Sequence, residues 1–81
     1  MRMLDIDREH SVRVLQLYLT SKEAKELRDE LSNLLQNPEH NLHFHVFAEN
    51  MSRELSCSIT TPIKLKEDGY TKLERKIFEE K

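Results

Sequence analysis

Apolar and polar residues alternate along three stretches of the chain, which is the pattern of β-strands with one buried face. The stretches cover residues 12–19, 41–49 and 54–60. In a strand, every second side chain points to the same side of the sheet. Each stretch therefore gives one apolar triplet to a common side: Leu15, Leu17 and Leu19, then Leu42, Phe44 and Val46, and finally Leu55, Cys57 and Ile59.

Two other stretches have the spacing of amphipathic helices. Thr20 and Glu23 form a capping-box motif, in which the hydroxyl and the carboxylate bond to each other's backbone amides. We expect a helix from there to Asn37-Pro38, because the residue before a proline is steered away from helical backbone angles. Its apolar stripe would be Ala24, Leu27, Leu31, Leu34 and Leu35. Thr71 and Glu74 repeat the motif before a short final helix with a Tyr70, Leu73 and Ile77 stripe.

The remaining segments read as connections. A polar turn at residues 50–52 joins the second and third strands as a hairpin. Pro62 ends the third strand, and residues 63–68 are expected to form a loop. Residues 1–10 are either flexible or a short extra edge strand, since Leu4 and Ile6 alternate with acidic residues.

The predicted architecture is a single α+β domain spanning residues 1–81, with the order β-α-β-β-α. Its three-stranded sheet would carry both helices on one face. Two pairings of the first strand remain open. It lies parallel to the second strand through a right-handed crossover, or antiparallel to the third.

Composition removes several classes of function. Thirteen Lys and Arg against fifteen Asp and Glu give a net charge of −2, so nucleic acid is not an expected partner. The lone Cys57 excludes an intramolecular disulfide, and no apolar run is long enough for a membrane span, so we expect a cytoplasmic chain. Catalysis is not expected, because Cys57 faces inward and a single glycine cannot form a phosphate-binding loop.

The uncovered face of the predicted sheet is the leading candidate for function, because two helices cover only one side. Its predicted partner-binding residues are Val12, Val14, Tyr18, His43, His45 and Phe47. A contiguous apolar patch of this kind indicates an interaction surface, either for a second copy of the chain or for another protein. In the alternative interpretation, Leu4 and Ile6 or Phe78 fold over this face and cover it.

Three histidines support a second hypothesis. His43 and His45 would project from the same face of a strand, and His40 precedes them in the adjoining loop. Three imidazoles suit Zn²⁺ or Ni²⁺. The alternative function is therefore a metal-binding domain that uses His40, His43 and His45, with zinc as its ion.

Overall fold

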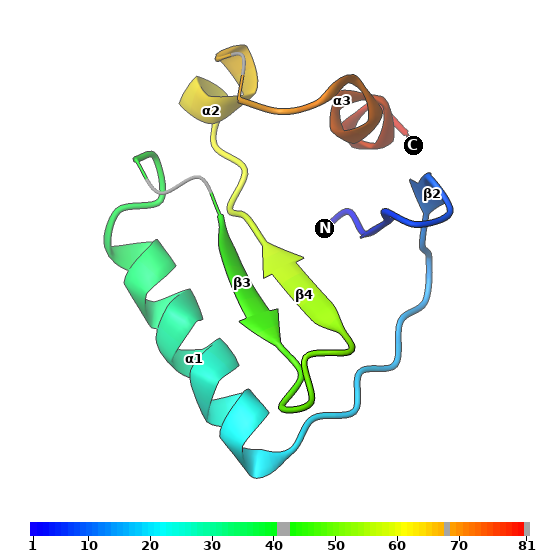
Figure 1. The fold of residues 1–81 in the computed structure, drawn as a ribbon. Coiled ribbons are helices and arrows are strands. Elements are labelled where there is room, and N and C mark those ends of the chain that lie inside the picture. Colours follow the sequence, from blue (N-terminus) through cyan, green and yellow to red (C-terminus); the bar gives the residue numbers. More distant parts are fainter. Residues whose placement is uncertain (41–42, 68, 81) are drawn as a thin grey trace.

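The computed structural model describes residues 1–40, 43–67 and 69–80, and over these residues the chain forms four short strands and three helices. Figure 1 shows their arrangement. In chain order the elements are β1 (Leu4–Asp5), β2 (His10–Ser11), α1 (Ser21–Gln36), β3 (Phe44–Phe47), β4 (Glu54–Cys57), α2 (Pro62–Lys66) and α3 (Lys72–Phe78).

Helix α1 begins and ends where the sequence predicts. The amide of Glu23 donates to the Thr20 hydroxyl at 3.1 Å, and the amide of Thr20 donates to the Glu23 carboxylate at 2.9 Å. Both halves of the capping box are therefore present. The helix ends at Gln36, immediately before Asn37 and Pro38. The predicted boundaries of this helix are confirmed.

The predicted hairpin is also confirmed. β3 and β4 pair antiparallel with Phe44 opposite Cys57 and Val46 opposite Leu55. The alternation sends Phe44 and Val46 to the side of α1, where they are 8% and 3% exposed and pack with Leu34. Leu27, Cys57 and Ile59 surround this cluster. Leu42, which was assigned to the same face, lies outside the described residues.

The prediction of one three-stranded sheet is wrong. The described residues form two separate two-stranded sheets, β1–β2 and β3–β4. The predicted first strand pairs with no other strand among the described residues. At one end the amide of Val12 donates to Met3 at 2.8 Å, beside the β1–β2 pair, and at the other Thr20 is fixed in the capping box. We call residues 13–19, between these two anchors, the connecting segment.

The N-terminal residues form the short strand β1, but it is not an edge of the main sheet. β1 pairs with β2 instead, with Leu4 opposite Ser11 and Asp5 opposite His10. In Figure 1 these strands lie beside α3 and apart from β3. The side chain of Arg2 links the two regions, since its Nε donates to the carbonyl of Ile77 at 3.1 Å.

The C-terminal third departs from the prediction in two ways. The expected loop at residues 63–68 contains helix α2, which Thr61 caps by accepting from the amide of Lys64 at 3.1 Å. Helix α3 forms with its predicted capping box. It does not share the face of the main sheet with α1, however. In Figure 1 it lies near β2, and the carbonyl of Ile77 accepts from the side chain of Arg2. Over the described ranges, α1 is the one helix that gives a buried side chain, Leu34, to the cluster on β3.

The chain exposes more surface than its size requires. Its accessible surface is 6916 Å². A folded monomer of 9.7 kDa is expected to expose about 5,100 Å². The radius of gyration is 13.4 Å, where about 12 Å is expected for a single domain of this length. Much of the apolar surface is therefore left outside the core. Within the described residues, none of the helices is long and apolar enough to cross a membrane.

Candidate functional site

The face of the β3–β4 hairpin that points away from α1 carries a compact group of side chains. His45 and Phe47 come from β3, and Glu54 and Ser56 come from β4, because these positions alternate with the buried ones. Phe47 is 40% exposed, and the side chains of His45 and Glu54 are 42% and 45% exposed. We call these four residues the outer face.

The rings of His45 and Phe47 on β3 and of His43 just before it form a row along this face. The rings of His43 and His45 meet edge to face with centroids 4.8 Å apart, and those of His45 and Phe47 stack with centroids 6.0 Å apart. The sequence predicted that these three side chains share one side of a strand, and the structure brings them together. The row therefore offers flat, half-exposed ring surfaces along most of β3.

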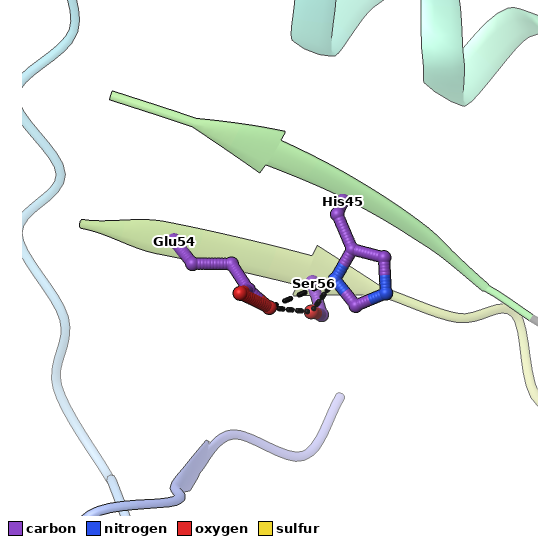
Figure 2. Close-up of polar contacts among 3 residues, drawn as sticks. All are labelled: His45, Glu54 and Ser56. Carbon is purple, nitrogen blue, oxygen red and sulfur yellow. Dashed lines mark hydrogen bonds and ion pairs between the residues drawn. The ribbon is translucent and has the colours of Figure 1, made fainter. Parts of the chain in front are cut away.

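Figure 2 shows the polar contacts among His45, Glu54 and Ser56 on the outer face, two of which meet at one nitrogen of His45. Nδ1 lies 2.8 Å from a carboxylate oxygen of Glu54 and 2.8 Å from the hydroxyl of Ser56. A carboxylate can only accept, so Nδ1 carries the proton. The Ser56 hydroxyl then accepts from Nδ1–H and donates to the same Glu54 oxygen at 3.2 Å. In the neutral ring, Nε2 is left with its lone pair.

A serine, a histidine and a carboxylate in contact invite comparison with the catalytic triad of hydrolases. In that triad the acid bonds to one ring nitrogen and the serine to the other, so that the oriented ring can take the serine proton. Here Glu54 and Ser56 both meet Nδ1 of His45. Nδ1 already holds a proton and cannot accept another. The arrangement fixes the ring without activating Ser56 as a nucleophile.

One end of this side of the hairpin contacts the C-terminal region. The hydroxyls of Ser58 and Tyr70 are 2.8 Å apart, and the Tyr70 ring packs edge to face on Phe78 at 5.0 Å. Phe78 thus approaches the hairpin through Tyr70, as the covering interpretation suggested, but Phe47 stays 40% exposed. Of the other proposed covers, Leu4 pairs with Ser11 in the β1–β2 sheet and Ile6 is itself 69% exposed.

The structure divides the predicted partner-binding residues into two groups. His45 and Phe47 lie on β3, and His43 lies just before it with its ring against that of His45. Val12 lies next to β2, while Val14 and Tyr18 belong to the connecting segment and are 84% and 83% exposed. The other side of this segment is exposed as well, at 52% for Leu15, 48% for Leu17 and 38% for Leu19. These three leucines were predicted to be buried, and that prediction is wrong.

The predicted metal ligands do not gather into one group. Among the described residues, no three His, Cys, Asp or Glu side chains lie close enough together to hold a metal ion. His43 and His45 are in ring contact, and no such group joins them to His40. Burial raises the pKa of the Cys57 thiol, which favours the neutral form over the thiolate that binds metals.

Basic side chains of the C-terminal third bond to backbone carbonyls. The ammonium of Lys64, a residue only 1% exposed, donates to the carbonyl of Pro38 at 2.9 Å. The guanidinium of Arg75 donates to the carbonyls of Leu65 and Glu67 at the end of α2. Cations suit the carbonyl-rich ends of helices. Two of the basic residues between positions 64 and 76 therefore form hydrogen bonds within the fold.

Sequence reasoning missed Glu54 and Ser56 as partners of His45. The register of the hairpin contains this information, because Phe47 pairs with Glu54 and His45 pairs with Ser56 once the turn fixes the register.

The structure also has a hollow of about 210 Å³ between the two chain ends, lined by residues 1–3, residues 11–13 and Glu80. Pockets for small molecules usually measure about 300–1,000 Å³.

Comparisons of the chain with protein-family models, with curated proteins and with solved structures found no match.

Proposed function

We propose that this chain is a non-enzymatic interaction domain that self-associates through the outer face of the β3–β4 hairpin and through the connecting segment. The observation that carries the proposal is the excess of exposed surface. The accessible area of 6916 Å² exceeds the expected monomer value by roughly 1,800 Å². A stable protein interface covers about 800 Å² on each partner.

The composition of the exposed surface supports the same proposal. Val14 and Tyr18 on the connecting segment and Phe47 on the outer face are large apolar side chains that remain in water. Aromatic residues surrounded by polar ones are typical of interface centres. The rings of His45 and Phe47 are stacked, and Glu54 and Ser56 hold His45 in place, so little side-chain entropy remains to be lost on binding.

A second copy of the chain is the partner that the charges favour. The net charge is only −2, so two copies repel each other weakly. The small core also favours self-association, since its main cluster has three buried residues among those described, Leu34, Phe44 and Val46. Small domains gain little net stability from burial inside one chain, and a partner subunit adds to it.

The test is the mass of the full chain in solution as a function of concentration, measured by sedimentation equilibrium. We expect a dimer whose dissociation constant rises at least about tenfold in Phe47→Ala and in Tyr18→Ala, as for a buried aromatic anchor. Ile6→Ala is the matched control, because Ile6 is equally apolar and 69% exposed but lies in the β1–β2 turn.

Two results would overturn the proposal. One is a chain that stays monomeric at the highest concentration reached. The other is a dimer that Ile6→Ala weakens as much as Phe47→Ala does, since association would then not depend on the outer face. Circular dichroism of each variant establishes that the core of α1, β3 and β4 remains folded.

A second candidate function is zinc binding, which the bonding of His45 favours. Glu54 holds the proton on Nδ1 and leaves Nε2 with a free lone pair, which is how carboxylates orient histidine ligands of metals. His43 is in contact with the same ring. Two imidazoles leave a tetrahedral ion incomplete, so a second copy would supply the other ligands.

Zinc binding is tested by thermal melting with and without stoichiometric Zn²⁺. A ligand that binds the folded state raises the melting temperature by mass action. We expect this rise to be lost in His45→Ala and in His43→Ala and to persist in His10→Ala, the control in β2. An unchanged melting temperature of the unsubstituted chain would rule out this candidate.

A further inference from the structure

We infer that the connecting segment of one copy adds as a third strand to the free edge of β4 in a second copy, and that the exchange is reciprocal. The inference rests on the proposed self-association and specifies how the connecting segment takes part in it. The strand that the sequence predicts at residues 12–19 is then formed, but between molecules. Edge-strand addition of this kind is a common way for proteins to recognise extended segments.

The backbone of β4 has an unpaired edge. The amide of Ala48 donates to the carbonyl of Arg53 at 2.9 Å, which makes this pair the hydrogen-bonded rung next to the turn. Rungs alternate along an antiparallel ladder, so Val46 with Leu55 is hydrogen-bonded and His45 with Ser56 is not. The amides and carbonyls of Glu54 and Ser56 therefore point away from β3. Over the described residues, no other strand pairs with β4.

The core-facing side chains along this edge of β4 are only partly covered. On β3 the core-facing residues Phe44 and Val46 are buried. On β4 the corresponding Leu55 and Cys57 are only half-buried, and so is Ile59 just beyond the strand. A strand added beside β4 would cover these three side chains. The β4 edge is therefore the side on which the apolar layer under the hairpin can be extended.

The connecting segment has the side chains that this edge needs. Leu15, Leu17 and Leu19 alternate with Val14, Gln16 and Tyr18. With the leucines placed on the core side, they extend the layer of Leu55, Cys57 and Ile59. Tyr18 then lies on the outer side with Glu54 and Ser56. Seven extended residues span about 23 Å, against about 13 Å for the four residues of β4, so the segment is long enough to cover the strand.

The anchors of the segment favour a second copy over the same chain. Val12 is hydrogen-bonded to Met3, and Arg2 ties this region to α3 through Ile77. Thr20 is fixed at the start of α1. With both ends held, the segment stays apart from β4 of its own chain in the described structure. The edge of a second molecule can approach it without breaking either anchor, and the same contact is then made twice about a two-fold axis.

The experiment is amide hydrogen exchange of the full chain by NMR, at one concentration below the dissociation constant and at one well above it. We expect the amides of Glu54 and Ser56 to exchange at least tenfold more slowly in the dimer. A sample that mixes isotope-labelled and unlabelled chains is expected to show contacts between Leu17 of one copy and Leu55 of the other.

A pair of variants in the connecting segment checks which side faces the core. Leu17→Ser is expected to raise the dimer dissociation constant at least about tenfold, because a buried leucine is lost. Gln16→Ser, one residue away and in the same extended segment, is expected to change it by no more than about twofold. Leu17 is 48% exposed in the single chain, so neither substitution affects the monomer core.

The outcomes separate this inference from the proposed function. A dimer in which Glu54 and Ser56 exchange as fast as in the monomer overturns strand addition and leaves self-association standing. Slow exchange of both amides in a sample that remains monomeric also overturns the inference, because the segment would then pair within its own chain. A chain that is monomeric under all conditions overturns both.

Discussion

Two residues other than glycine adopt left-handed backbone angles within the described chain, Glu9 with φ 58° and Met51 with φ 61°. Each stands near the end of a turn between paired strands, so the left-handed residue helps to bring the chain back into the second strand. A side chain beyond Cα makes this conformation cost about 1–2 kcal/mol, and glycine avoids most of that cost.

Replacing Met51 with glycine is therefore expected to stabilise the hairpin. Met51 is 69% exposed, so its side chain contributes little packing that would be lost. We expect Met51→Gly to raise the free energy of unfolding by about 0.5–1 kcal/mol in urea denaturation, despite the greater freedom of glycine in the unfolded chain. Asn50→Gly is the control. It should lower stability, because the Asn50 side chain accepts from the amide and hydroxyl of Ser52.

Glu23 makes the stability of the fold depend on pH in the acid range. Hydrogen bonds from the amides of Thr20 and Glu49 to its carboxylate hold the pKa of Glu23 below its ordinary value of 4.5. As the pH falls, the unfolded chain is therefore protonated at Glu23 before the folded chain is. The stabilisation is complete above pH 4.5 and is lost as the pH falls through the lower, folded-state value.

The melting temperature, measured between pH 7 and pH 2, is expected to fall as the stabilisation by Glu23 is lost. Glu23→Gln should melt at a lower temperature at pH 7, since an amide can accept with one oxygen where the carboxylate uses two. Its melting temperature should fall less than that of the unsubstituted chain in the acid range. Glu26→Gln, on the exposed side of α1, is the control and should retain the full acid dependence. Equal pH profiles for all three proteins would contradict the role of Glu23.

Among the elements, the helices were the most predictable because their signals are local. The capping boxes at Thr20 and Thr71 each need only four consecutive residues, and both formed. Helix α2 carries a similar local signal, with Thr61 as cap and Pro62 in the first turn. The sequence prediction took Pro62 as the end of a strand and missed it. In the structure the strand β4 already ends at Cys57, and Pro62 is the first residue of α2.

The strand at residues 12–19 was predicted wrongly for a reason that is not local. A strand needs a partner, and composition shows only that Val14 or Leu17 suits a strand, not where its partner lies. The hairpin succeeded because its partner lies just beyond a short turn. The same limit applies to the outer face. Alternation placed His45 and Phe47 together, but the bonds to Glu54 depend on the register across two strands.

Helix α2 depends on one buried cation that the sequence did not single out. The stem of Lys64 is enclosed, and its ammonium reaches the carbonyl of Pro38 at 2.9 Å. Lys64→Met keeps most of the stem and removes the charge, so we expect a loss of about 1.5–3 kcal/mol in the free energy of unfolding by urea denaturation. Lys66→Met, exposed on the same helix, should change it by less than about 0.5 kcal/mol. Similar losses of stability in both variants would show that the positive charge on α2 matters, and not the hydrogen bond of Lys64 to Pro38.

At the scale of the whole molecule, the surface left exposed is large and the buried core is small. The core cluster consists of Leu34, Phe44 and Val46 with partly buried neighbours. If two chains complete each other, part of the folding free energy comes from association and depends on concentration. We expect the melting temperature to rise by several degrees over a hundredfold increase in chain concentration. A melting temperature independent of concentration would show that one chain holds all of the stability.

The hydrogen bond that the amide of Glu49 donates to the Glu23 carboxylate also limits how the length of this chain can change during evolution. Glu23 secures the start of α1 to the β3–β4 turn, and Leu34 packs under Phe44 eleven positions later. One residue inserted between them would turn Leu34 about 100° around the helix and away from the sheet. Related chains should therefore preserve the number of residues between these two positions. They can lengthen instead in the β1–β2 turn, where residues 6–9 are exposed.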